Sequence, residues 1–203
     1  AQRATLVGFR RCFCVYSVHH RGTPKRPGLV LGLDRGGACT GMAFRVANED
    51  APGIRAYLRA REQTEGVYRE AHQPVELPST REEVLALAFI VERSHVNYAG
   101  RLPVAAQARI IASARGVSGA NTDYLINTLE HLEEMGIRER ELERVLTLAG
   151  PHAAREHGGE NGHARPTSVS MQRALSGKPA LTRPRQPKNP GQRFLYRLQG
   201  SSV

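Results

Sequence analysis

Cysteine is scarce in this chain of 203 residues, and long apolar runs are missing. Three cysteines exclude the dense disulfide framework of a small secreted protein, and their odd number favours a reducing compartment. No apolar run approaches the roughly 18 residues of a membrane-spanning helix, and the first residues lack the basic-then-apolar order of a secretory signal. We therefore expect a cytoplasmic protein without a membrane partner.

Several motifs of catalytic and metal-binding proteins are also missing. The chain has no G-x-x-x-x-G-K-[ST] loop and no G-x-S-x-G turn, which are the usual signals of nucleotide hydrolysis and of α/β-hydrolase chemistry. Cys12 and Cys14 flank one residue, and without a second pair this spacing does not make a zinc site.

Positive charge is abundant and unevenly distributed. The net charge is +10, and 40% of the residues are hydrophobic, which is enough for a folded core. Residues 1–150 hold 20 basic and 17 acidic side chains, whereas residues 151–203 hold 9 and 2, together with six of the twelve prolines. We expect a folded domain over 1–150 and a basic, proline-rich, disordered tail over 151–203, with one short docking patch at 194–198. The tail lacks the aromatic interleaving of an RNA-binding arm, so nucleic acid is not the expected partner.

Strand signals dominate the first half of the domain. β-Branched and aromatic residues predict strands over 11–18, 29–33, 39–46 and 67–77, with a turn at 34–37 between the second and the third. Residues 84–91 are compatible with a buried strand, but Ser79 and Glu82 also resemble the capping box that begins a helix. Periodicity does not separate these alternatives over so short a run.

Helix signals dominate the second half. Asp50 and Pro52 predict a helix start, and the apolar spacing continues to Glu62. Further helices are expected over 103–115, from 122 or 123 to 134, and over 138–148. The order predicts an α+β fold, with the strands in an antiparallel meander or a small barrel.

Four local clusters contain polar residues that a packed core does not require: 19–24, 61–69, 97–100 and 116–121. Each has a structural explanation when it is taken alone, as a surface loop, a helix end, a half-buried aromatic residue or the turn before a helix. The clusters become more informative when they are taken together, in their order along the chain.

In that order the chain resembles the ChaC-type γ-glutamylcyclotransferases. The resemblance spans about residues 5–149. It rests on the segments 8–15, 20–24, 27–33, 41–46, 57–62, 66–69, 98–100 and 118–125. It implies a γ-glutamylcyclotransferase-like fold, a small mixed β-barrel with flanking helices, and an enzyme that cleaves glutathione to 5-oxoproline and cysteinylglycine. It implies no metal and no cofactor.

The resemblance also assigns roles to three residues. Glu62, in the Arg-Glu pair before Gly66, matches the catalytic glutamate, while Tyr68 and Tyr98 resemble residues that line the substrate pocket. A free Glu has a pKa of about 4.3 and is too weak a base to be efficient near neutral pH. We therefore expect burial to raise the pKa of Glu62. Arg61 would oppose that change, but adjacent helical side chains point about 100° apart, and we expect them to stay separate.

One family feature is not found in the sequence. The family's first strand and its Tyr-Gly-Ser-Leu loop, which holds the γ-glutamyl group, have no match here, so we expect the chain to be a fragment or to have lost that loop. The alternative is therefore a catalytically inactive domain that acts as a binding protein, with its basic tail contacting RNA or another acidic partner.

Overall fold

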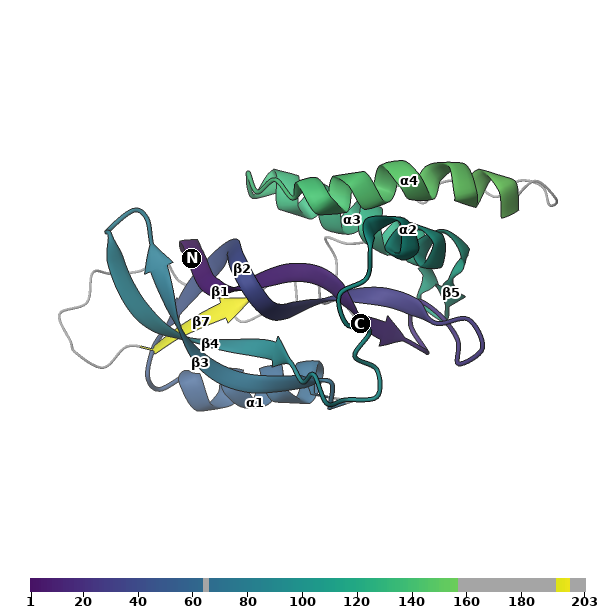
Figure 1. Ribbon diagram of the computed structural model, residues 1–203. Coiled ribbons are helices and arrows are strands. Elements are labelled where there is room, and N and C mark those ends of the chain that lie inside the picture. Colours follow the sequence, from purple (N-terminus) through teal and green to yellow (C-terminus); the bar gives the residue numbers. More distant parts are fainter. Residues whose placement is uncertain (64–65, 157–192, 198–203) are drawn as a thin grey trace.

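The computed structural model describes residues 1–63, 66–156 and 193–197, which form seven strands and four helices (Figure 1). The strands are β1 (Gln2–Ser17), β2 (Gly28–Val46), β3 (Tyr68–Leu77), β4 (Glu82–Val91), β5 (Arg115–Gly116), β6 (Gly119–Ala120) and β7 (Arg193–Arg197). The helices are α1 (Ala51–Glu62), α2 (Val104–Ser113), α3 (Asn121–Glu134) and α4 (Arg140–Glu156).

An antiparallel sheet forms the centre of the molecule. β1 pairs with β2 along most of its length, β3 and β4 form a hairpin, and Thr5 with Glu76 joins β1 to β3. β7 lies between β2, to which it is antiparallel, and β4, to which it is parallel, so the strands follow the closed order β1-β2-β7-β4-β3. The predicted α+β class is confirmed.

The predicted turn at 34–37 is wrong, because β2 continues through it. Val7 pairs with Ala38 and Phe9 with Arg35, so Gly36 and Gly37 on β2 face the single residue Gly8 on β1. All three glycines have positive φ, a conformation that glycine adopts without steric cost. The pair of glycines therefore makes a bulge in a long strand rather than a reversal.

Residues 84–91 form a strand, which settles the alternative that the sequence left open. β4 pairs with β3 from Leu77 opposite Glu82 to Tyr68 opposite Val91. The backbone N–H groups of Thr80 and Arg81 donate to the carbonyl of Leu77, so the capping-box sequence makes a hairpin turn.

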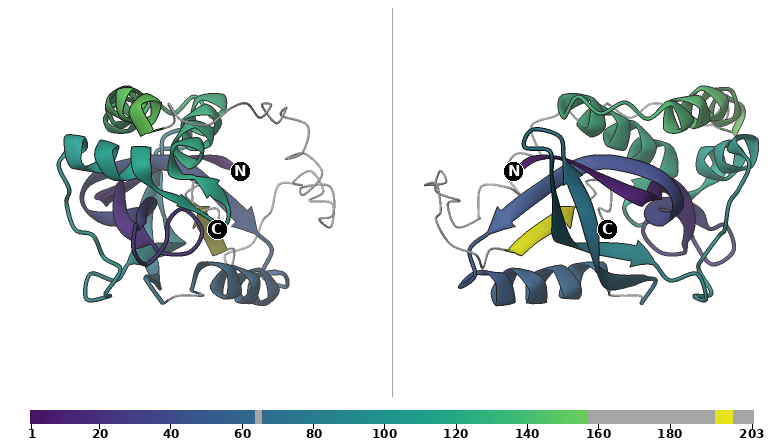
Figure 2. Two further views of the ribbon diagram at one scale, coloured as in Figure 1. Left: turned by 90° about the vertical axis from the view of Figure 1, so that its right-hand side faces the viewer. Right: turned by 60° about the vertical axis from the view of Figure 1, so that its left-hand side comes forward.

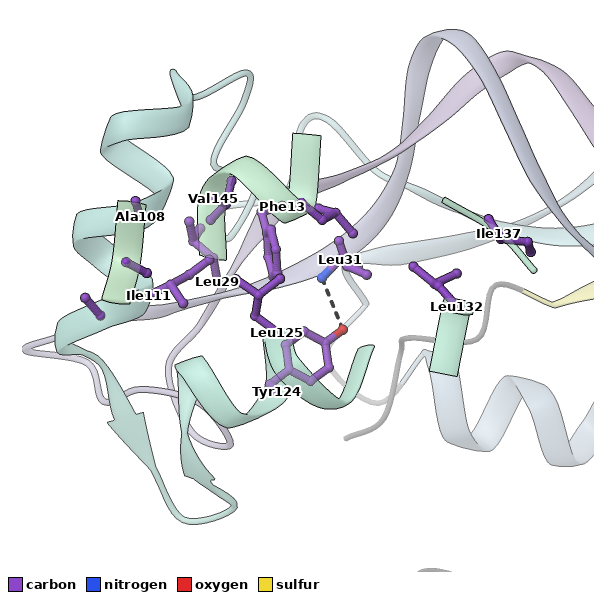
Figure 3. Close-up of a cluster of buried hydrophobic side chains, with 13 residues drawn as sticks. Phe13, Leu29, Leu31, Ala108, Ile111, Tyr124, Leu125, Leu132, Ile137 and Val145 are labelled. Atoms are coloured by element: carbon purple, nitrogen blue, oxygen red, sulfur yellow. Dashed lines mark hydrogen bonds between the residues drawn. The ribbon is translucent and has the colours of Figure 1, made fainter. Parts of the chain in front are cut away.

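The helices cover the strands from two sides. α2, α3 and α4 lie together on one side and α1 lies on the other (Figures 1 and 2). Under α2, α3 and α4, buried side chains of β1 and β2 such as Phe13, Leu29 and Leu31 pack against Ile111 and Leu125 (Figure 3). A second buried cluster, with Leu6, Leu33 and Ile90, joins the strands to one another.

The predicted tail contains two elements that the structure describes. α4 continues past residue 150 to Glu156, and the proposed docking patch at 194–198 falls largely on β7. Residues 157–192 and 198–203, the rest of the predicted disordered tail, lie outside the described residues. None of the helices that the structure describes is long and apolar enough to cross a membrane.

Candidate active site

Glu62 is the last residue of α1, and it is buried although glutamate usually lies at the surface. Only 9% of Glu62 is exposed. Arg55, Arg59 and Glu62 follow one another at i, i+4 and i+7, so they share one face of the helix. A buried carboxylate with charged neighbours is the kind of group from which enzymes make general acids and bases.

The Arg61 side chain lies beside the carboxylate of Glu62, the next residue in the helix. Its Nε lies 3.4 Å from Oε1 of Glu62, so the expectation that the two groups stay separate is wrong. The arginine side chain is long enough to span the angle between adjacent helical positions. The Glu62 carboxylate therefore lies beside a permanent positive charge.

Glu70 on β3 holds α1 through two arginines. Arg55 Nε donates to Glu70 Oε1 at 2.7 Å, and Arg59 Nε donates to Oε2 at 2.5 Å. Burial alone would raise the pKa of Glu70, but the hydrogen bonds and charges of the two guanidinium groups outweigh it and lower the pKa. Glu70 is therefore a fixed anion that binds the helix to the sheet.

Two tyrosine hydroxyls meet the backbone of Leu31 on β2. Tyr68 Oη donates to the Leu31 carbonyl at 2.7 Å, and the Leu31 N–H donates to Tyr124 Oη at 3.4 Å, as Figure 3 shows for Tyr124. Burial raises the pKa of Tyr124, and the negative charge of Glu62 adds to this effect. The end of α1 therefore lies within electrostatic reach of α3, across β2.

Tyr98 is fixed by a different carboxylate. Its hydroxyl donates to Asp34 Oδ2 at 3.2 Å, and Asp34 also accepts hydrogen bonds from Arg10 and Arg93. Burial and the charge of Asp34 raise the pKa of Tyr98. Because Tyr98 donates its proton to Asp34, its oxygen can act toward a ligand as an acceptor.

One apolar cluster brings Tyr68 and Tyr98 together. Both rings pack against a buried group from β1, β4 and the segment before β3, which consists of Cys12, Cys14, Val15, Val67 and Val91. Val67 lies five residues after Glu62 in the chain, so the same short segment connects the end of α1 to this cluster.

The clusters 19–24, in the connection from β1 to β2, and 116–121, around β5 and β6, contact each other. Arg21 Nη1 donates to the carbonyl of Ser118 at 2.5 Å, and His20 Nδ1 lies 2.9 Å from Ser118 Oγ. A Cβ at Gly116 would lie 2.3 Å from the carbonyl oxygen of His19, so the loops approach this closely only because residue 116 is glycine. These residues are explained by packing between loops.

The described residues offer no metal site. Within 1–63, 66–156 and 193–197, no group of three or more His, Cys, Asp or Glu side chains is arranged to hold a metal ion. Of the carboxylates described above, Glu70 and Asp34 are each held by two arginines.

A comparison with protein-family models matches residues 1–150 to the family described as ChaC-like protein. The chain belongs to the ChaC-like protein family. The resemblance deduced from the sequence motifs is thereby confirmed.

Similar proteins with curated names are cyclotransferases. The chain is 33% identical over 142 residues to the glutathione-specific γ-glutamylcyclotransferase of Escherichia coli K12, a match that covers 70% of this chain and 61% of that protein. It is 31% identical over 142 residues to γ-glutamylcyclotransferase 2-3 of Arabidopsis thaliana, covering 66% of this chain and 71% of that one. The matched region thus spans less than two thirds of the length of the bacterial relative.

A solved structure shares the fold. The crystal structure of a yeast γ-glutamyl cyclotransferase specific to glutathione superimposes with a TM-score of 0.62 and 22% identity, covering 77% of this chain and 90% of that one. This likeness supports the α+β architecture of the ChaC-like chain.

In this ChaC-like protein, two of the three predicted site residues, Tyr68 and Tyr98, pack against one apolar cluster. Glu62 ends α1, five residues before Val67 of that cluster. Their catalytic and binding roles remain predictions. The sequence analysis did not identify the roles of Glu70 and Asp34, although the i, i+4, i+7 spacing of Arg55, Arg59 and Glu62 was a signal for the charged helix face.

Proposed function

We propose that this chain holds the catalytic region of a γ-glutamylcyclotransferase that converts glutathione to 5-oxoproline and cysteinylglycine. The observation that carries the proposal is a buried carboxylate, Glu62, at the end of α1 in a chain of the ChaC-like family. Relatives at about 30% identity are named as glutathione-specific enzymes of this activity.

The reaction needs one group that both accepts and donates a proton. The substrate's α-amino nitrogen attacks its own γ-carbonyl carbon, and the new C–N bond closes a five-membered lactam while the bond to the cysteinyl nitrogen breaks. Because both reacting groups belong to one molecule, holding that molecule in a folded conformation supplies much of the rate. Glu62 takes the proton from the attacking amine and returns it to the leaving nitrogen.

The environment of the nearby carboxylates favours Glu62 for this role over Glu70 and Asp34. Arginine partners lower the pKa values of Glu70 and Asp34, although burial opposes the change in both. A carboxylate held in its ionised form is a weak base, since base strength falls with pKa. At Glu62, burial favours the raised pKa that we expect, whereas Arg61, whose Nε lies 3.4 Å from the carboxylate, opposes it, so the proposal requires the effect of burial to exceed that of Arg61.

The two tyrosines are proposed as substrate-binding residues. Because the Tyr98 hydroxyl donates to Asp34, we propose that its oxygen accepts a hydrogen bond from the substrate's ammonium or amide N–H. Tyr68, on the same apolar cluster, would border the γ-glutamyl chain. This arrangement selects for the γ-glutamyl part of the substrate.

The proposal is tested by following 5-oxoproline released from glutathione. We expect the wild-type chain to release it and Glu62→Gln to lose activity by at least about 100-fold, because proton transfer contributes 10²–10⁴-fold. Glu143→Gln, which alters an exposed ion pair with Arg138 on the opposite side of the strands, is the matched control. Absence of 5-oxoproline from the wild-type chain, or full activity in Glu62→Gln, would contradict the proposal.

A further inference from the structure

We infer that Glu70 is a positioning residue that keeps the Arg59 guanidinium from pairing with Glu62. The inference rests on the proposed role of Glu62. Its starting point is the shared helix face, since Arg59 lies three residues before Glu62 and side chains three or four residues apart are neighbours on a helix. Arg59 can therefore reach either of two carboxylates, Glu62 on its own helix or Glu70 on β3.

The structure shows which carboxylate Arg59 binds. Arg59 donates to Glu70 from Nε at 2.5 Å and from Nη2 at 3.4 Å. Arg55, one turn earlier, donates to the same carboxylate, so both oxygens of Glu70 are occupied by cations. The Glu70 side chain is 9% exposed, whereas the Arg59 side chain is 51% exposed, so the carboxylate is shielded from water while the arginine remains partly solvated.

Apolar packing fixes the first part of α1 but not its last turn. Ala51, Ile54 and Leu58 pack against Val46 and Leu87. No residue of α1 after Leu58 belongs to this cluster. The Arg59–Glu70 pair ties the last turn of the helix to β3. Its loss would free both the end of the helix and a cation three residues from Glu62.

Two described groups act on Glu62 directly. Arg61 Nε on α1 lies 3.4 Å from its carboxylate, and Tyr124 on α3, which Arg21 faces across its ring at 5.4 Å, lies within electrostatic reach of it. On β3, Glu70 binds Arg59, and Tyr68 donates its hydroxyl to Leu31. With Glu70 in place, Arg59 is neutralised by that carboxylate, while Arg61 lies 3.4 Å from Glu62. Without the Glu70 charge, Glu62 would have two arginines beside it.

Three variants distinguish this role from simple stabilisation of the fold: Glu70→Gln, Arg59→Gln and the double variant. In Glu70→Gln, we expect the titration midpoint of Glu62 to fall by about one pH unit, as for a carboxylate that gains an arginine partner. The plateau kcat should then fall about three- to tenfold because the base is weaker, with KM changed less than about twofold. Arg59→Gln should lose less activity than Glu70→Gln.

The double variant distinguishes a positioning role of Glu70 from a purely structural one. Removing Arg59 as well should return the Glu62 midpoint and kcat to near their wild-type values, because no freed cation remains three residues from Glu62. A purely structural clamp predicts the opposite, with equal losses in both single variants and no recovery. Glu143→Gln should leave the midpoint unchanged.

The Glu62 midpoint is read by NMR of ¹³C-labelled glutamate side chains in the full chain, with Glu62→Gln to assign the signal. This measurement does not require turnover. A wild-type chain that makes no 5-oxoproline would therefore overturn the proposed function and leave the inference about Arg59 testable. An unchanged midpoint in Glu70→Gln, or no recovery in the double variant, would overturn the inference.

Discussion

The phenolic hydroxyl of Tyr98 donates a hydrogen bond to Oδ2 of Asp34, a carboxylate whose side chain is only 1% exposed. Arg93 Nε donates to the other oxygen at 2.7 Å, and Arg10 Nη2 donates to Oδ2 at 3.2 Å. Asp34 thus joins β1, β2 and the segment after β4 at one buried anion. Three different donors on one carboxylate make it a sensitive point for stability and for the orientation of Tyr98.

Replacing Asp34 with Asn should destabilise the protein by about 1–3 kcal/mol at pH 7, because hydrogen bonds to a charged group are lost. Burial raises the pKa of Asp34, but the hydrogen bonds and charge of Arg93, with help from Tyr98, lower it overall. A lowered pKa stabilises the folded state above the unfolded value of about 3.9, and the benefit is lost as the pH falls through the folded pKa.

Urea unfolding of wild type and Asp34→Asn should therefore show a stability difference that is full at pH 6–7 and shrinks below about pH 4. Asp123→Asn, at an exposed position on α3, serves as the control and should show a smaller difference at neutral pH. A difference between wild type and Asp34→Asn that stays constant from pH 7 to pH 3 would contradict the role assigned to the carboxylate.

Replacing Tyr98 with Phe should raise KM for glutathione by up to about tenfold, the worth of one hydrogen bond, and should change kcat less. The reason is the proposed acceptor role of its oxygen, which the phenyl ring lacks. Tyr57→Phe alters an exposed tyrosine on α1 and is the matched control. If both variants had the wild-type KM, Tyr98 would not contact the substrate through its hydroxyl.

Asn121 is expected to be one of the most sensitive positions in the helical layer. Its side chain is fully buried, accepts from the Leu29 N–H at 2.6 Å and donates to the Leu29 carbonyl at 2.8 Å. Asn121→Ala leaves both backbone groups without this partner and should cost about 2–4 kcal/mol. Asn127→Ala, on the exposed face of the same helix, should cost less than about 1 kcal/mol in the same denaturation experiment.

The sequence alone was sufficient to predict the helices, and the family resemblance singled out Glu62 as the candidate base, a role that stays a prediction. Apolar spacing located α1, α2 and α3 to within a few residues, since periodicity reports which face a helix buries. The ordered motifs then identified the family and, through it, the end of α1 as the place of the candidate base. These are local signals, and the structure changes little about them.

Contacts between distant segments were not predictable in this way. The sequence Asp34-Arg35-Gly36-Gly37 has the composition of an exposed turn, and this interpretation missed both the continuous β2 and the buried carboxylate. Similarly, Glu70 lies in a strand of mixed polarity, and nothing in β3 alone shows that Arg55 and Arg59 meet it. In both cases the pairing of strands and helices decides which charged groups are buried.

Strand β7 provides a further test of such distant pairing. Met42–Val46 on β2 pairs with Arg193–Arg197, and β4 contributes Ala86 and Leu87 on the other side. Ending the chain after residue 192 would leave these segments of β2 and β4 without their strand partner, whereas ending it after residue 197 keeps the pairing. We expect the shorter chain to lose about 2 kcal/mol, which lowers Tm by about 4–8 °C for a protein of this size.

Amide hydrogen exchange locates the effect of that truncation. In the chain that ends after residue 192, amides within 42–46 should exchange faster, while those of α2 and α3 should change little, because β7 pairs only with β2 and β4 among the described strands. Equal Tm values and equal exchange in the two truncated chains would show that β7 does not contribute to the sheet. If the shorter chain folded more slowly but kept its Tm, unfolding would have to slow by the same factor, so the β7 pairs would stabilise the transition state but not the native state. That result would also contradict a strand that adds to the stability of the native state.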